Sequence, residues 1–156
     1  MGQLSSRYVS QTARQITSSG LGNSSAKLIP SNSVIISCRA PIGHVAINEV
    51  PMSFNQGCKG LTPRDDVSTE YLYYFLLASK HRLNDLGTGA TFKEISTKTL
   101  ASVPIPLPPL TEQERIVAKL DEAFADIEKA IENTEKNLVN ATELFESYVS
   151  LILSSP

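Results

Sequence analysis

The 156 residues of this chain leave room for one compact domain of about a hundred residues and one long additional element. No apolar run approaches the length of a membrane span, and the N-terminus lacks the basic and apolar regions of a secretion signal. We therefore expect a soluble, cytoplasmic protein without a membrane partner. Its two cysteines, Cys38 and Cys58, do not form the pattern of a disulfide scaffold and are expected to be free thiols.

The formal net charge of −2 hides a difference between the two parts of the chain. Residues 1–110 carry ten Lys and Arg against six acids, whereas residues 111–156 carry four basic residues against ten acids. The first part is thus +4 and the second −6. A basic first part favours contact with phosphates, although an acidic exposed helix also serves solubility.

The first half of the chain predicts loops followed by a β-hairpin. Residues 1–27 are rich in Ser, Gln, Thr, Gly and Asn and predict irregular structure, with a short helix near Ser10–Ile16. Ser33–Ser37 and Val45–Asn48 are short and rich in β-branched residues, which is typical of strands. Arg39–Gly43 predicts the tight turn that joins them.

The next segments alternate turns with short regular elements. Phe54–Leu61 predicts a glycine-containing bend that leads into another strand, and Ser68 is the expected N-cap of one helix that ends near Leu83. Gly87–Thr91 predicts a polar loop and Phe92–Ile95 a short strand. A mixed sheet accompanied by helices makes the expected fold class α+β.

Two features precede the C-terminal part. Ser96 or Thr97 is the expected cap of a further helical turn. Val103–Pro109 carries alternating prolines, which exclude a central strand and leave an edge strand or a stiff connector. A PxxP ligand is a further interpretation, although the segment directly adjoins a helix start.

The C-terminal part, from Thr111 to Ile152, predicts one long helix. Thr111 and Glu114 have the spacing of a capping box, and the segment contains no Gly or Pro. From Gln113 onward, alternating steps of four and three residues meet mostly apolar side chains, which is the 3.5-residue repeat of a coiled coil. The apolar seam comprises Val117, Leu120, Phe124, Ile127, Ile131, Leu138, Ala141, Phe145, Tyr148 and Ile152.

A helix of this length extends over about 60 Å, which is too long to lie on one small domain. Left in water, its seam would be a large exposed apolar patch, and the chain offers no second helix of that length. The sequence therefore predicts a partner helix from another chain.

Three stretches together resemble the DNA-specificity (S) subunit of type I restriction–modification systems. They are PSNSVIISCRAPIGHVAI at residues 30–47, GTGATFKEIS at 87–96 and VPIPLPPLTEQERIV at 103–117. The order of the stretches also matches that family, and the resemblance extends from about Lys27 to Ile152.

The resemblance implies a role in DNA recognition. In that family, two target-recognition domains each read half of an interrupted site, and two long helices pair antiparallel and dock modification (methyltransferase) subunits. We accordingly expect residues 1–110 to form one target-recognition domain without its usual front part. Residues 111–153 would form one spacer helix, so that the chain corresponds to a half-subunit or a fragment.

A lone helix with a continuous seam can pair antiparallel with its own copy and form a two-fold dimer that imitates a complete subunit. Such a dimer would recognise an inverted repeat. The expected partners are thus double-stranded DNA, the modification subunit, the restriction subunit through the complex, and a second copy of this chain. A heterodimer with a separate half-subunit is the alternative arrangement.

The candidate DNA contacts lie in loops that the predicted strands would hold in place. Arg39 could reach a guanine edge or a phosphate, or form a salt bridge with a nearby acid. The amides of Asn55 and Gln56 could pair with adenine, or stabilise their own turn. Basic and hydroxyl groups that could hold phosphates, or simply face solvent, are Lys59, Thr88, Thr91 and Lys93.

Catalytic interpretations find little support. No Lys has an Asp or Glu two residues before it, and no glycine-rich nucleotide loop follows a strand at the needed spacing. The cysteines and histidines lack the paired spacing of a zinc site. We expect no enzyme activity, no metal and no cofactor. The interpretations left open are a DNA-recognition module, a coiled-coil scaffold that binds only protein, and an enzyme without a recognisable motif.

Overall fold

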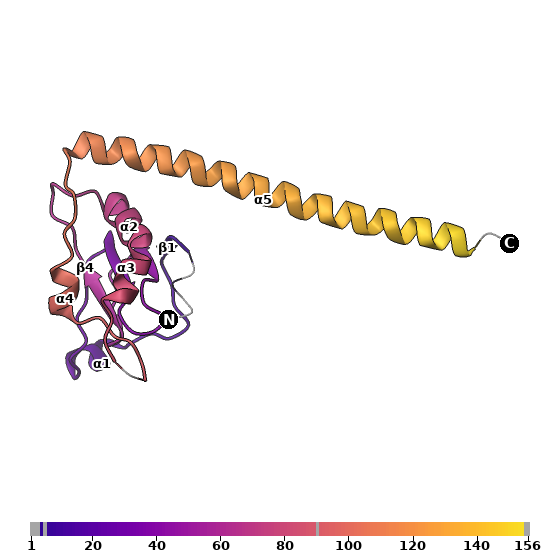
Figure 1. The fold of residues 1–156 in the computed structure, drawn as a ribbon. Coiled ribbons are helices and arrows are strands. Elements are labelled where there is room, and N and C mark those ends of the chain that lie inside the picture. Colours follow the sequence, from indigo (N-terminus) through magenta and orange to yellow (C-terminus); the bar gives the residue numbers. More distant parts are fainter. Residues whose placement is uncertain (1–3, 5, 90, 155–156) are drawn as a thin grey trace. The chain divides into compact units, whose positions relative to one another are not determined.

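A computed structural model describes residues 4, 6–89 and 91–154 (Figure 1). Positions 1–3 and 5 of the N-terminal stretch, and Ala90 of the loop expected at Gly87–Thr91, lie outside the described residues. Contacts within the chain divide it into two units, residues 1–117 and residues 118–156. The first unit contains a sheet with helices, and the second continues the helix α5 (Leu110–Leu153), which confirms the α+β class.

The described residues form a four-stranded sheet in the order β1-β3-β2-β4. Its strands are β1 (Tyr8–Val9), β2 (Ser33–Ser37), β3 (Val45–Asn48) and β4 (Cys58–Leu61). The predicted hairpin is confirmed, because β2 and β3 pair antiparallel with Ile35 opposite Ala46. β4 pairs antiparallel with the other edge of β2, with Ser37 opposite Cys58. All five residues of β2 are consequently buried.

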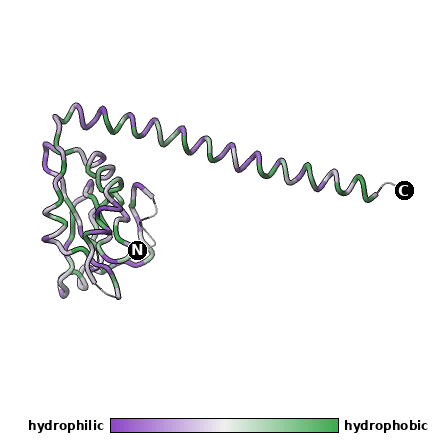
Figure 2. Tube along the Cα trace, viewed as in Figure 1, coloured by the Kyte–Doolittle hydropathy of each residue, from purple (hydrophilic) through white to green (hydrophobic). Residues whose placement is uncertain are grey.

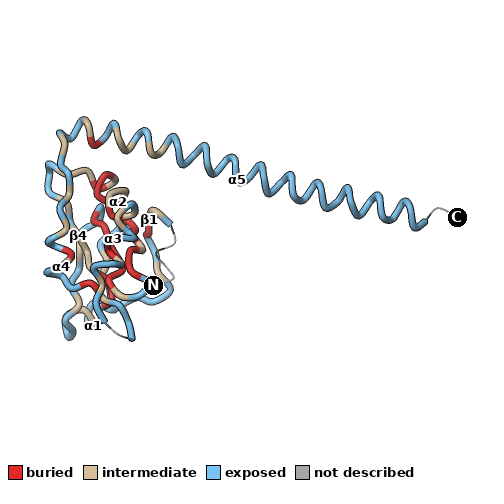
Figure 3. The backbone as a smooth tube through the Cα atoms, in the orientation of Figure 1, coloured by how far each residue is buried: buried red, intermediate tan, exposed pale blue. Residues whose placement is uncertain are grey.

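One face of the sheet packs against α2 (Thr69–Ala78) and supplies the core. Alternate β2 residues Val34 and Ile36 join Leu72 and Leu76 of α2 in one apolar cluster, as the period of two along a strand requires. Each such side chain contributes about 1.5–3 kcal/mol on burial. Figure 3 shows the buried residues concentrated in the sheet and α2.

The N-terminal expectation was partly wrong. Ser10–Ile16 is not helical, and the short helix α1 lies instead at Ser18–Gly22, where the Thr17 hydroxyl accepts from the Gly20 N–H. The preceding residues form β1, which sequence reasoning missed. This strand pairs parallel with β3: the Ile47 N–H donates to the Arg7 carbonyl at 2.8 Å, and the Glu49 N–H donates to the Val9 carbonyl at 2.9 Å.

The single helix expected from Ser68 to Leu83 is two helices. Ser68 caps α2 as predicted, with its hydroxyl accepting from the Tyr71 N–H. Ser79 then adopts ψ +2°, and the chain restarts as α3 (Lys80–Asp85). The bend brings Leu83 into the core cluster, where it is fully buried, and tertiary packing has therefore overridden the continuous pattern.

Ser96 caps the predicted helical turn, α4 (Thr97–Ala101), through the Thr99 N–H. No strand forms at Phe92–Ile95, where the chain makes only isolated bridges. Val103–Pro109 is a connector without strand pairing in the described structure, which confirms the second of its two interpretations.

The capping box was misplaced. α5 begins at Leu110, so Thr111 lies in the first turn instead of at the N-cap. The carbonyl of Pro109, which has no N–H of its own, accepts from the N–H groups of Glu112 and Gln113 and starts the helix.

Candidate nucleic-acid interface

Three loops meet at the end of the sheet where β2 finishes and β4 begins. The N–H groups of Cys38 and Arg39 both donate to the Gly57 carbonyl, at 2.7 and 3.3 Å. The Ala40 N–H donates to the Lys93 carbonyl at 3.0 Å. The structure thereby brings together the loops at residues 39–43, 55–57 and 87–95. Six of the seven predicted DNA contacts lie on these loops, and the seventh, Lys59, lies on β4. We call this set of loops the loop end of the sheet.

Arg39 makes the ion pair that was one of its two interpretations. Its Nε donates to a Glu94 carboxylate oxygen at 2.8 Å, and backbone bridges also join the two residues. The two side chains remain 43% and 40% exposed. The guanidinium is thus held in a fixed orientation at the surface, which is a geometry suited to a bidentate contact with a guanine or a phosphate.

The two neighbouring amide side chains, those of Asn55 and Gln56, differ in their hydrogen bonds and exposure. Asn55 uses its side-chain oxygen to accept from the Gly57 N–H at 3.0 Å, which is the turn-stabilising role considered from the sequence. Gln56, the next residue, is exposed at the tip of the same turn. Lys59 lies on β4 opposite Ile36 and is half-buried.

The loop at residues 87–95 is closed at its base. Thr88 and Glu94 exchange both of their backbone hydrogen bonds, at 3.0 and 2.9 Å. Gly89 has φ +126°, and a Cβ there would lie 2.3 Å from the Phe92 carbonyl oxygen, so glycine is required at this position. Thr88, Thr91 and Lys93 are exposed on the loop, as predicted.

Phe92 is a residue of this loop that sequence reasoning did not single out. Its side chain is 75% exposed, although it lies between Thr91 and Lys93 among the candidate contacts. An aromatic residue in a glycine- and threonine-rich loop was the signal available, because such a loop has little core to fill.

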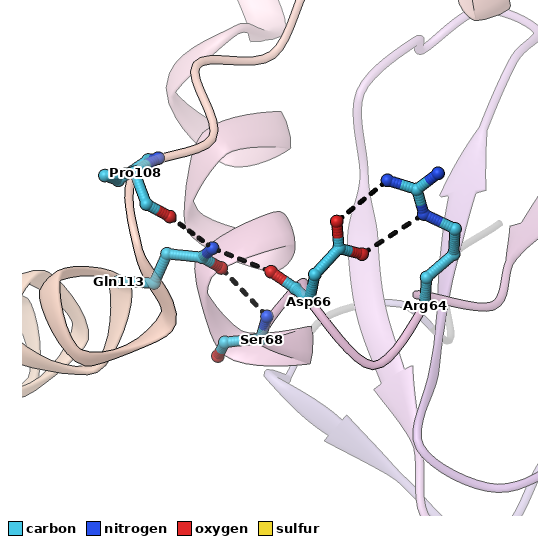
Figure 4. Close-up of polar contacts among 5 residues, drawn as sticks. All are labelled: Arg64, Asp66, Ser68, Pro108 and Gln113. Carbon is cyan, nitrogen blue, oxygen red and sulfur yellow. Dashed lines mark hydrogen bonds and ion pairs between the residues drawn. The ribbon is translucent and has the colours of Figure 1, made fainter.

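A second polar site joins the start of α5 to the N-terminus of α2 (Figure 4). The Gln113 side chain is fully buried, and its Oε1 accepts from the Ser68 N–H at 2.9 Å. Its Nε2 donates to the carbonyls of Asp66 and Pro108 at 3.0 and 2.9 Å. Gln113 is the polar position from which the repeat was counted, and its amide is used within its own unit.

The Gln113 contact takes over a standard capping role. In a capping box the residue three positions after the cap binds the free N–H of the N-cap, but that residue here is Tyr71. Gln113 supplies the acceptor from a distant part of the chain instead. The Tyr71 hydroxyl in turn donates to the Pro106 carbonyl at 2.9 Å, which fixes the proline connector.

The predicted seam of α5 is a row of exposed apolar side chains in the single chain. Figure 2 shows apolar and polar residues alternating along the helix, and Figure 3 shows its distal part exposed. From Phe124 onward, the exposed fractions of the seam's large side chains lie between 43% at Phe124 and 69% at Leu138 and Ile152. Val117 and Leu120, nearer the start of the helix, are half-buried.

The two thiols are free, as predicted, and lie on opposite faces of the sheet. Cys38 belongs to the core cluster, whereas Cys58 lines a pocket of about 450 Å³ with Ile35. Burial raises the pKa of Cys38 to about 11 and also raises the pKa of Cys58.

Within the described ranges, no three His, Cys, Asp or Glu side chains gather closely enough to bind a metal ion. Nor does any helix among the described residues have the length and apolar character needed to cross a bilayer.

Comparison with known proteins identifies the family. A family model described as "Type I restriction modification DNA specificity domain" matches residues 3–139. The chain belongs to this family. The resemblance inferred from the three sequence stretches is therefore confirmed.

Curated relatives include specificity subunits of type I restriction enzymes. The MjaIX subunit of Methanocaldococcus jannaschii is 36% identical over 146 residues, covering 90% of this chain and 33% of the relative. The EcoR124I/EcoR124II subunit of Escherichia coli is 31% identical over 150 residues, covering 90% of this chain and 36% of the relative. The chain spans about a third of the length of these relatives.

Solved structures show the same relationship. A chain from a study of complex assembly and conformational transition in a type I R-M system has a TM-score of 0.63 and 36% identity, covering 74% of this chain and 29% of its own length. The HsdS subunit from Thermoanaerobacter tengcongensis has a TM-score of 0.56 and 35% identity, covering 65% and 24% respectively.

Proposed function

We propose that this chain is a sequence-specific DNA-binding specificity module of a type I restriction–modification complex. Residues 1–110 act as the target-recognition domain and residues 111–153 as the spacer and partner helix. The chain has no catalytic chemistry of its own and acts in the cytoplasm by directing modification and restriction subunits to a bipartite site. Membership of the specificity family supports this role.

The observation that carries the proposal is the gathering of the candidate contacts at the loop end of the sheet. Six of the seven candidate residues, from three separate sequence segments, lie on loops that hydrogen-bond to one another, and Lys59 lies on the adjoining strand β4. The Arg39–Glu94 pair and the closed base of the 87–95 loop hold these side chains in place without burying them. Fixed, exposed basic and polar groups are what base and phosphate recognition requires.

Selection from random duplexes tests the function directly. The chain together with its modification subunit should enrich a bipartite inverted repeat, because a two-fold pair presents two identical recognition domains. The affinity for the selected duplex should fall steeply with salt concentration, since phosphate contacts release counterions. Enrichment of no sequence above the starting pool would contradict the proposal.

A matched pair of lysine variants locates the interface. Lys93→Gln should weaken binding to the selected duplex about three- to tenfold at low salt and reduce the salt slope by about 1. Lys129→Gln removes the same charge from an exposed position on α5 and should leave both quantities unchanged. Equal effects of the two substitutions would exclude the loop end as the DNA surface.

The exposed seam of α5 favours a second candidate function. The chain would then be a coiled-coil half-subunit that binds modification subunits, or another specificity subunit, without recognising DNA itself. Both candidates predict capture of the modification subunit. Only the first predicts a preference among duplex sequences, so the selection experiment separates them.

The same seam supports self-association. We propose an antiparallel homodimer through α5, with a heterodimer of two different half-subunits as the alternative. Light scattering of the isolated chain at micromolar concentration should give twice the mass of one chain. A stable monomer would leave the heterodimer or the modification subunit as the partner that covers the seam.

A further inference from the structure

The sizes of the seam residues distinguish the possible ways in which two α5 helices can pair. In a parallel pair each seam residue meets its own copy, so Ala141 would face alanine and Phe145 would face phenylalanine. One cross-section of the pair would then hold two small side chains and the next would hold two large ones, which disfavours close packing. An antiparallel pair places residues from the two halves of α5 opposite each other.

The heptad spacing permits two antiparallel registers that cover most of the helix. In the first, Ile131 lies opposite the partner's Ala141, and we call it the Ala141 register. In the second, Ile131 lies opposite the partner's Thr134, and we call it the Thr134 register. The two differ by a shift of one heptad.

A groove on α5 fits the Ala141 register. It measures about 310 Å³ and is lined by Ile127, Ala130, Ile131, Thr134 and Glu135. In the Ala141 register, the partner's Leu138 lies opposite Thr134, and the partner's Leu144 lies beside Ala130. Two large apolar side chains thus meet the two short ones in the groove. The Thr134 register would place the partner's Asn137 beside Ala130 and leave the groove less well filled.

Charge along the flank of the seam selects the same register. Glu128 and Glu135 lie next to the seam, one heptad apart. In the Thr134 register, Glu128 of each chain lies beside the partner's Glu135, which brings like charges together on both sides of the two-fold axis. In the Ala141 register, Glu128 lies beside the partner's Thr142, and one like-charge contact remains, between Glu135 and its own copy at the two-fold axis. The Ala141 register thus has one such contact where the Thr134 register has two.

The two ends of the seam agree with this choice. In the Thr134 register, Ile152 lies opposite the partner's Gln113, whose amide is fully buried and hydrogen-bonded within its own unit. Ile152, which is 69% exposed in one chain, would gain little cover there. In the Ala141 register it lies opposite the partner's Leu120, an available seam residue.

We infer that two copies of this chain pair in the Ala141 register, with Phe124 opposite the partner's Tyr148 and Ile127 opposite the partner's Phe145. The inference rests on the proposed self-association and specifies its geometry. At 1.5 Å per residue, the two Gln113 positions are then about 70 Å apart along the pair, against about 60 Å in the Thr134 register. That difference corresponds to about 3 base pairs, so the register sets the spacing between the two half-sites.

Cysteine pairs in the full chain test the register, because both native thiols are buried. Under mild oxidation, Ile131→Cys with Ala141→Cys should give a disulfide-linked dimer on a non-reducing gel. Phe124→Cys with Ala141→Cys should not, since those positions face each other only in the Thr134 register. Ile131→Cys alone should also stay unlinked, because it meets its own copy only in a parallel pair.

A mixture of the single variants Ile131→Cys and Ala141→Cys, tagged to differ in size, should give only the mixed dimer, which provides the same test without a double substitution. Cross-linking of the Phe124 pair, or of Ile131→Cys alone, would overturn the register while self-association stands. A monomer by light scattering would overturn both self-association and the register. Duplex selection is measured separately, so failure of DNA recognition is distinguishable from either result.

Discussion

Replacing Gln113 removes the polar contact that fastens the start of α5 to α2. Gln113→Ala leaves the Ser68 N–H and the carbonyls of Asp66 and Pro108 without their amide partner. An unsatisfied buried polar group costs about 1–3 kcal/mol. Because these three groups are only part-buried and water can reach some of them, we expect a total loss of about 2–4 kcal/mol. That is a substantial part of the 5–15 kcal/mol typical of a domain.

Urea unfolding followed by near-ultraviolet circular dichroism measures this loss. Four of the five tyrosines lie in residues 1–117 and the chain has no Trp, so the signal reports mainly on that unit. Glu114→Ala, an exposed neighbour in the same helical turn, is the matched control and should change the free energy of unfolding by less than about 0.5 kcal/mol. Gln113→Glu keeps an acceptor for the Ser68 N–H but loses both donors, and should be intermediate or worse. Equal stability of Gln113→Ala and the control would refute the anchoring role.

Three further predictions concern the loop end and the core. Arg39→Ala breaks a largely exposed ion pair with Glu94, so it should lower stability by less than about 1 kcal/mol in thermal unfolding, yet weaken binding to the selected duplex at least tenfold. Gly89→Ala forces a Cβ against the Phe92 carbonyl, and should weaken duplex binding in a fluorescence titration because the loop must rearrange. Cys38 keeps its proton up to about pH 11 in the folded chain but loses it near 9.0 when unfolded. The unfolded state binds fewer protons in that interval, so stability should fall as pH rises from 9 to 11, and the Cys38→Ser variant should show a shallower decline in urea titrations.

Local sequence signals were sufficient where the contacts are local. The strands at 33–37 and 45–48 and the Ser68 cap were predicted correctly, and Ser96 is one of the two caps expected for α4, because β-branched runs and capping hydroxyls act within a few residues. Local signals gave the wrong secondary structure where contacts with a distant segment decide the conformation. Ser79 interrupts a continuous helical pattern because Leu83 is needed in the core, and β1 forms because a β3 edge is available to pair with it.

The candidate DNA contacts also show what the local sequence indicates and what only tertiary contacts determine. Residue type and loop context were enough to select Arg39 and Lys93, but not to show that Glu94 orients Arg39 or that Phe92 is exposed between the basic and hydroxyl groups. The spacing of Gln113 fits the heptad, although its side chain is polar. Spacing carries no information about which polar groups lie nearby in space.

The sequence by itself determined the family, the α+β class and the apolar repeat of the long helix, because each is written in residue order and short-range periodicity. Only the tertiary structure decided which loops meet at the end of the sheet. It also decided that the first position of the repeat is committed to an internal hydrogen-bond network. Both depend on hydrogen bonds between segments separated by up to 55 residues, and such contacts leave no pattern in the sequence around either partner.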